Sequence, residues 1–141
     1  MLLTVLCLML LATTATSQDS FGDVIANIRH TIKDIKSNCF QTEGVDENEL
    51  ERILMLGKYD STNHDLKCAV KCLYVNTEIM SSTGEINEAN MKTKTGTSNV
   101  DIQDAVVANC KGFTDSDLCE RTYKISNCTY HTIKSGLTGR E

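Results

Sequence analysis

The sequence predicts an all-α domain that is held together by disulfide bonds. Apolar residues recur at helical spacing in several segments, the chain contains no proline that would interrupt a helix, and only 5% of its residues are aromatic. The same composition disfavours a sandwich of aromatic, turn-punctuated β-strands. Residues 18–141 suffice for one domain, and a second domain does not fit.

The N-terminal residues have the pattern of a secretory signal. Residues 1–11 are apolar apart from Thr4, and small residues precede Gln18. We therefore expect a cleaved signal peptide at 1–17, a mature domain at 18–141 and a secreted, extracellular protein. The apolar run is shorter than the roughly 20 residues of a membrane span, so no membrane anchor is expected.

Three helices are predicted in the N-terminal half. A capping box at residues 46–49 starts the second helix and Gly57 ends it, and polar residues 61–65 cap a third helix that is expected to run to Met80. The first helix spans residues 21–39, where apolar side chains share one face: Val24, Ile25, Ile28, Ile32 and Ile35.

Three more helices are predicted in the C-terminal half, which makes six in total. Residues 81–99 are mostly polar and are expected to hold one short helix at 86–92. Residues 98–101 cap the fifth helix, and residues 114–117 cap the sixth. The tail at 132–141 contains two glycines and is expected not to be helical. The sixth helix carries a stripe at helical spacing: Leu118, Thr122, Ile125, Thr129 and Ile133.

Six of the seven cysteines remain once Cys7 leaves with the signal, and an even number in an oxidising compartment indicates disulfides. Cys68 and Cys72 lie four apart on one helix, with Cβ atoms roughly 5–6 Å apart, whereas a disulfide needs about 3.5–4.5 Å. Cys119 and Cys128 lie nine apart, on opposite faces of a helix. Excluding both pairs leaves ten of the fifteen pairings open.

The cysteine order resembles the signature of the insect odorant-binding proteins, the pheromone-binding and general odorant-binding family of six-cysteine type. Between Cys39 and Cys128, successive cysteines are separated by 28, 3, 37, 8 and 8 residues. The gap of three and the last gap of eight are the family's most constrained spacings. The resemblance implies a compact six-helix domain around an internal apolar cavity, with bridges Cys39–Cys72, Cys68–Cys119 and Cys110–Cys128.

The function that this resemblance implies is to carry a small apolar molecule, such as an odorant or pheromone, to a receptor. Pockets for such ligands are lined by aliphatic, Met and aromatic side chains. The candidates are Leu54, Tyr74, Ile79, Met80, Met91, Val106, Tyr123, Tyr130 and Ile133. Each is equally well explained as an ordinary core residue. Because these candidates include no charged side chain, we expect a neutral ligand, and we expect the tail to help close the pocket.

A secreted enzyme of phospholipase A2 type is the alternative from another functional class. The His64-Asp65 pair, followed by Cys68, is similar to the His-Asp pair of the secreted phospholipases A2, but the adjacent cysteines before the His and the glycine-rich calcium loop are missing. We expect His64 to be a solvated residue at a helix N-terminus. His30 and His131 have no recognisable nucleophile beside them, so we expect no catalytic residue, no metal and no cofactor.

A non-sensory carrier and a secreted interaction protein are further alternatives. The net charge of −5 weighs against nucleic acid and anionic membranes as partners. An olfactory receptor and a second copy of the chain, in a homodimer, are the protein partners that we consider. Asn127-Cys128-Thr129 fits a glycosylation sequon, but Cys128 is expected in a disulfide, which argues against modification there.

Overall fold

Helix α7 (Leu118–Thr138) is the axis on which the other helices are arranged. The computed structural model describes residues 19–138, so the predicted signal at 1–17 lies outside the described residues. Within residues 19–138 there are seven helices, and the only β-type pairing is one bridge between Met80 and Ile86. The remaining helices are α1 (Phe21–Ile32), α2 (Lys36–Thr42), α3 (Asn48–Leu56), α4 (His64–Asn76), α5 (Glu88–Thr93) and α6 (Val100–Cys110).

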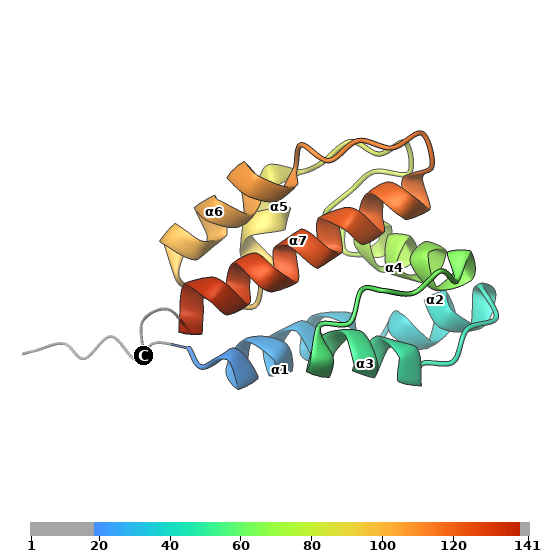
Figure 1. Ribbon diagram of the computed structural model, residues 1–141, viewed down its shortest axis with the longest axis horizontal. Helices are drawn as coiled ribbons and strands as arrows, with labels where there is room; N and C mark the ends of the chain where they lie inside the picture. Colours follow the sequence, from blue (N-terminus) through green and yellow to red (C-terminus); the bar gives the residue numbers. More distant parts are fainter. Residues whose placement is uncertain (1–18, 139–141) are drawn as a thin grey trace, which may run out of the picture.

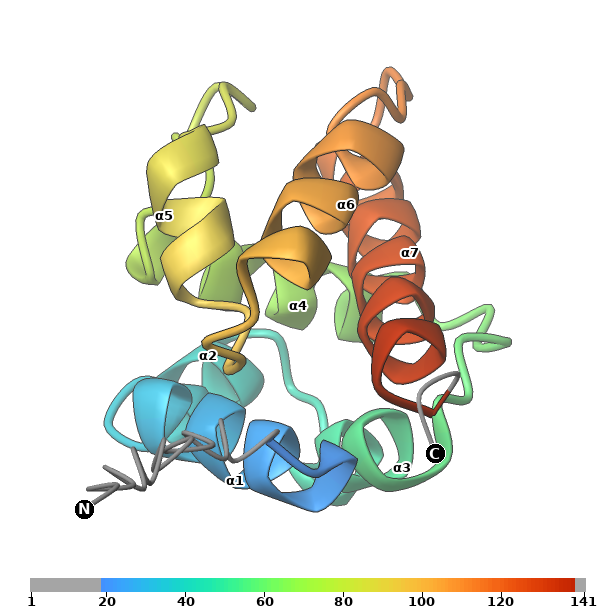
Figure 2. The same ribbon diagram turned by 90° about the vertical axis from the view of Figure 1, so that its left-hand side faces the viewer.

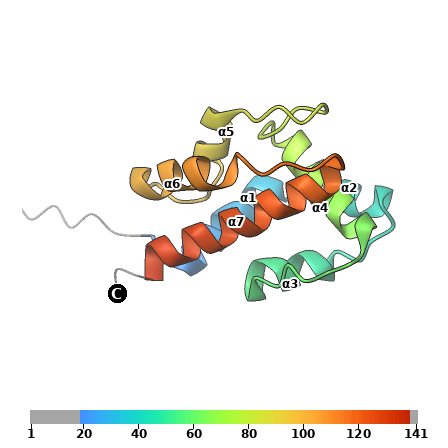
Figure 3. The ribbon, with the colours of Figure 1, turned by 45° about the horizontal axis from the view of Figure 1, so that its top comes forward.

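Two groups of helices lie on either side of α7. Figure 1 shows α5 and α6 above α7 and α1 to α3 below it, and in Figure 2 these groups form an upper and a lower layer. Helix α7 packs against α4, α6 and α1, and Figure 3 shows it running across α1. The predicted all-α class is confirmed. None of the helices at 19–138 is long and apolar enough to cross a membrane.

The first predicted helix is in fact two helices, so the prediction of six helices is wrong by one. At the break, the Ile35 amide donates to the Ile32 carbonyl (3.1 Å), which tightens the turn to an i→i+3 bond. The chain then changes direction into α2, which packs against α4. Cys39 and Phe40 become fully buried as a result, and a straight helix over 21–39 could not place them there.

Helix α4 ends at Asn76, four residues before the predicted end at Met80. The Thr77 hydroxyl donates to the Leu73 carbonyl (2.8 Å), and Glu78 has a left-handed backbone with φ of 59°. A non-glycine residue in this conformation ends a right-handed helix. The chain therefore turns away toward α5, which begins two residues later than the predicted helix at 86–92.

The predicted non-helical tail is also wrong, because α7 continues to Thr138. Gly136 lies against α6 so closely that a β-carbon on it would be 2.8 Å from Cγ1 of Ile102. The glycine thus permits close helix packing here instead of ending the helix. As a result, Ile133 is buried and Leu137 packs against the α5–α7 part of the core.

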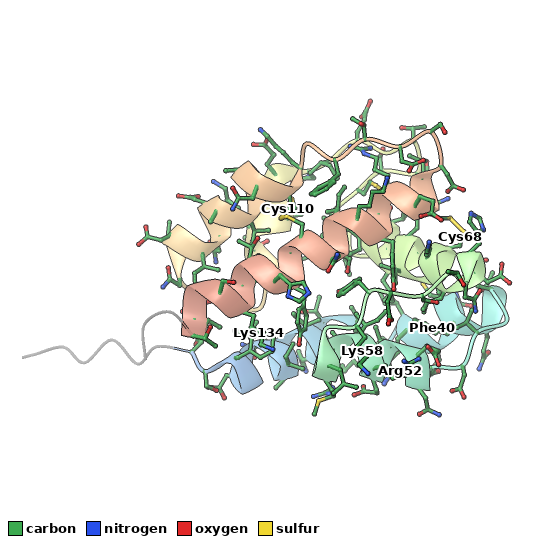
Figure 4. All side chains as sticks on the ribbon, viewed as in Figure 1. Phe40, Arg52, Lys58, Cys68, Cys110 and Lys134 are labelled. Carbon is green, nitrogen blue, oxygen red and sulfur yellow. A yellow bond between two sulfur atoms is a disulfide. The ribbon has the colours of Figure 1, made fainter. Side chains whose placement is uncertain are left out.

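The three disulfides follow the pairing that the family resemblance implies. Figure 4 labels Cys68 near the α4 end of the molecule and Cys110 between α6 and α7. Two of the bridges tie α4 to other helices, and the third ties α6 to α7, so the pairing prediction is confirmed. The bonds are Cys39–Cys72 (2.03 Å), Cys68–Cys119 (2.07 Å) and Cys110–Cys128 (2.00 Å).

Candidate functional site: an apolar pocket between two core clusters

A pocket lies where two hydrophobic clusters of the core meet. One cluster joins α1 to α4 and two tyrosines of α7, and the other joins α5, α6 and α7 with Val24 of α1. Ile28 and Tyr74 pack against both clusters and also line the pocket. The pocket volume is about 110 Å³. Its wall is built from five of the seven described helices, α1, α3, α4, α5 and α7, and from the loops after α3, α4 and α5.

The wall is predominantly apolar. Helix α3 and the central part of α4 supply mainly branched aliphatic side chains because the buried stripes of these helices line the pocket. Ten aliphatic or Met residues form most of the wall: Ile28, Ile32, Leu50, Ile53, Leu54, Val70, Leu73, Ile79, Met91 and Ile133. Three tyrosines, five small hydroxyl residues and one lysine complete it: Tyr59, Tyr74, Tyr130, Thr31, Thr77, Thr95, Ser126, Thr129 and Lys94.

The structure brings six of the nine candidate residues together in this wall and leaves three outside it. Met80 is buried beside the Thr122 hydroxyl, which lies 3.7 Å from its sulfur. Val106 is fully buried among the α5–α7 cluster. Tyr123 packs its ring 5.1 Å from that of Tyr59. The six in the wall are Leu54, Tyr74, Ile79, Met91, Tyr130 and Ile133.

Most residues of the pocket wall were not among the nine candidates predicted from the sequence. Ile28 and Ile32 were predicted only as part of the apolar stripe of the first helix, a signal that does not distinguish core from pocket. Tyr59 lies in the loop after α3, where no periodic pattern points to it. Lys94, directly after α5, is a charged residue in the wall, so the prediction that the ligand would meet no charged side chain rested on an incomplete list.

Hydroxyl groups on one part of the pocket wall differ in whether they have a hydrogen-bond partner. The hydroxyls of Tyr59 and Ser126 share a hydrogen bond of 2.9 Å. Burial raises the pKa of the Tyr74 hydroxyl, and the nearby hydroxyls of Ser126 and Thr129 oppose that rise. Thr129 Oγ1 nevertheless completes no hydrogen bond, and neither does Tyr130 Oη, among residues 19–138. Burial alone raises the pKa of Tyr130.

His64 lies outside the pocket, at the exposed N-terminus of α4 as predicted. Its Nε2 is 2.6 Å from Oδ2 of Asp117, and this hydrogen bond raises the pKa of His64 and lowers that of Asp117. The sulfurs of Cys68 and Cys119 lie beside it. Since these sulfurs are bonded to each other, they offer no thiolate, and this cluster is not a metal site.

The fold and the pocket define a class: small, disulfide-stapled, all-α proteins with an apolar pocket. The family model of the PBP/GOBP family matches residues 23–132. The chain therefore belongs to this family, the pheromone-binding and general odorant-binding proteins, whose members are binding proteins rather than enzymes.

A solved structure supports the fold independently. The chain is similar to an odorant-binding protein of Locusta migratoria, with 18% identity, a TM-score of 0.59, and coverage of 86% of this chain and 88% of that one. At this identity the likeness concerns the fold alone. Among curated protein sequences, none matches the chain significantly.

Proposed function

We propose that this protein is a secreted carrier that takes up small, largely apolar ligands in the pocket between α1, α3, α4, α5 and α7. The observation that carries the proposal is the pocket wall, in which ten of nineteen residues are aliphatic or Met and three more are tyrosines. Each Å² of apolar ligand surface that leaves water contributes about 25 cal/mol. Membership of the PBP/GOBP family supports the same function.

The size of the pocket limits the ligand. A volume of about 110 Å³ is below the roughly 300–1,000 Å³ of sites for drug-sized molecules, and an engineered cavity of about 150 Å³ holds benzene. A larger ligand would have to push side chains of the wall aside. Met91 is suited to this because its unbranched thioether adapts to irregular space.

We propose odorants, pheromones or similar semiochemicals as the ligands, and delivery to a receptor as the role of the carrier. A non-sensory carrier of lipophilic molecules would use the same pocket. The tissue that expresses the transcript distinguishes them: sensory tissue supports the first role, and salivary or reproductive tissue alone supports the second.

Displacement of a fluorescent apolar probe tests the carrier function. We expect the probe to bind and small apolar competitors to displace it. Ile79→Trp should weaken probe binding by about tenfold because the indole fills a partly accessible part of the pocket wall. The matched control is Val100→Trp, at a position that is 62% exposed and outside the wall. An unmodified protein that binds no apolar probe would contradict the proposal.

A further inference from the structure

Lys94 is the one charged residue in the pocket wall within the described part of the chain. It follows the last residue of α5 and is partly buried. Its ammonium donates a hydrogen bond to the backbone carbonyl of Thr77, which is itself part of the wall. The charged end of Lys94 therefore lies at the pocket and is not extended into solvent.

This ammonium has donors to spare. An ammonium group carries three N–H donors, and Thr77 uses one of them. The neighbouring hydroxyls of Thr77 and Thr95 donate to the carbonyls of Leu73 and Lys92, so they offer acceptors to the pocket. Of these three side chains, Lys94 is thus the one that can donate to an incoming oxygen.

The charge of Lys94 is not balanced by a carboxylate in the described part of the chain. Lys94 takes part in none of the seven ion pairs found among residues 19–138. Lys92, two residues earlier, pairs with Asp104 at 2.7 Å, and that contact raises its pKa. A partly buried cation beside an apolar wall lacks the solvation it has in water, and an anion is the natural partner for it.

We propose that the pocket prefers amphipathic anions, with Lys94 binding a carboxylate head and the aliphatic wall enclosing the hydrocarbon body. This inference rests on the proposed carrier function and narrows its ligand class. A carboxylic acid of ordinary pKa is ionised at pH 7. A charge-assisted hydrogen bond from Lys94 would be stronger than any bond that the wall can make to a neutral alcohol.

Matched pairs of ligands test the inference at pH 7. Saturated carboxylates of about six to about twelve carbons provide hydrocarbon bodies of increasing length for an apolar pocket, and each is compared with the primary alcohol of equal length by titration calorimetry. We expect the carboxylate to bind about five- to tenfold more tightly than the alcohol, a factor reduced for the partial exposure of Lys94.

Three variants assign the preference to Lys94. Lys94→Met keeps the apolar stem, and it should remove the five- to tenfold advantage of the carboxylate while changing the affinity for the alcohol less than about twofold. Lys94→Arg retains the charge and should keep the preference. Lys92→Met removes a charge two residues earlier, in α5 and outside the pocket wall, and should leave both affinities unchanged.

The outcomes separate the two proposals. Equal affinity for acid and alcohol in the unmodified protein, or a preference that survives in Lys94→Met, overturns the role of Lys94 and leaves the carrier function standing. Failure of both ligand series and of the apolar probe to bind overturns the carrier function itself. Loss of acid binding in Lys92→Met to the same extent as in Lys94→Met indicates a general charge effect and also overturns the role of Lys94.

Discussion

Gly57 lies against the ring of Tyr130 so closely that a β-carbon on it would be 2.4 Å from Cε1 of that ring. Gly57 is the C-cap of α3, with φ of 62°, and Tyr130 is buried on α7 in the pocket wall. One glycine therefore both ends a helix and sets the distance between α3 and α7. The shape of the pocket on this side depends on that contact.

Replacing Gly57 should affect stability and binding together. In Gly57→Ala the left-handed backbone costs about 1–2 kcal/mol, and the ring of Tyr130 must also move. Gly44→Ala is the matched control, because φ there is 68° and nothing lies within 4 Å of an added β-carbon. We expect Gly57→Ala to lose at least about 1 kcal/mol more than Gly44→Ala in urea unfolding with the disulfides intact. Gly57→Ala alone should also weaken probe binding; equal effects of the two variants would contradict this role.

Two of the three wall tyrosines, Tyr59 and Tyr130, should respond differently to loss of the hydroxyl. Tyr130 Oη is buried with no hydrogen-bond partner within residues 19–138, so Tyr130→Phe removes a desolvated polar group and should leave the free energy of unfolding unchanged or raise it by about 1 kcal/mol. Tyr59→Phe breaks the hydrogen bond to Ser126 and should lower the free energy of unfolding by about 0.5–1.5 kcal/mol. Denaturant unfolding of the ligand-free variants measures both; a clear loss in Tyr130→Phe would mean that its hydroxyl is satisfied after all.

The His64–Asp117 contact should make stability depend on pH. The pKa of His64 is raised in the folded protein, so its contribution is complete below about pH 6.5 and is lost as the pH rises through the folded pKa. The pKa of Asp117 is lowered, so its contribution is present above about pH 3.9 and is lost as the pH falls through the folded pKa. We expect His64→Gln to destabilise the protein more at about pH 5.5 than at about pH 8.5.

Asp117→Asn provides the control for this pair. Oδ1 of Asp117 accepts hydrogen bonds from the Cys119 and Glu120 amides (2.8 and 3.3 Å), and Asn can retain this cap. In the Asp117→Asn background, the effect of His64→Gln should no longer vary between these two pH values. A pH dependence that persists there would assign the effect to another group.

Shortening α7 tests how far its C-terminal end supports the pocket. Deleting residues 132–141 removes Ile133, which is 1% exposed and lines the wall, and Leu137, which packs behind it. We expect probe affinity to fall about tenfold or more, since a fully buried aliphatic side chain contributes about 1.5–3 kcal/mol. Deleting only 139–141 is the control. Circular dichroism should show that the disulfide-linked helices persist, and unchanged affinity with preserved helicity would remove this segment from the site.

The local features of the fold were predictable because they depend on short-range chemistry. Helical periodicity placed the stripes of α1 and α7, and the capping residues predicted at 61–65 include Asn63, the N-cap of α4. The cysteine spacing excluded two pairings by geometry. The resemblance to a known family then supplied the connectivity that geometry had left open, including the bond between Cys39 and Cys72.

Tertiary contacts decided the features of the fold and of the pocket wall that the sequence did not predict. Periodicity marks a side chain as facing inward, but only packing decides whether it meets another side chain, as Val106 does, or the pocket, as Ile28 does. Likewise, Gly136 looks like a helix stop in the sequence, and only its contact with Ile102 makes it a helical residue. Lys94 is a charged residue, and no apolar periodicity in the sequence marks it as part of the pocket wall. It belongs to the wall because the turn after α5 brings its ammonium to the carbonyl of Thr77, 17 residues away.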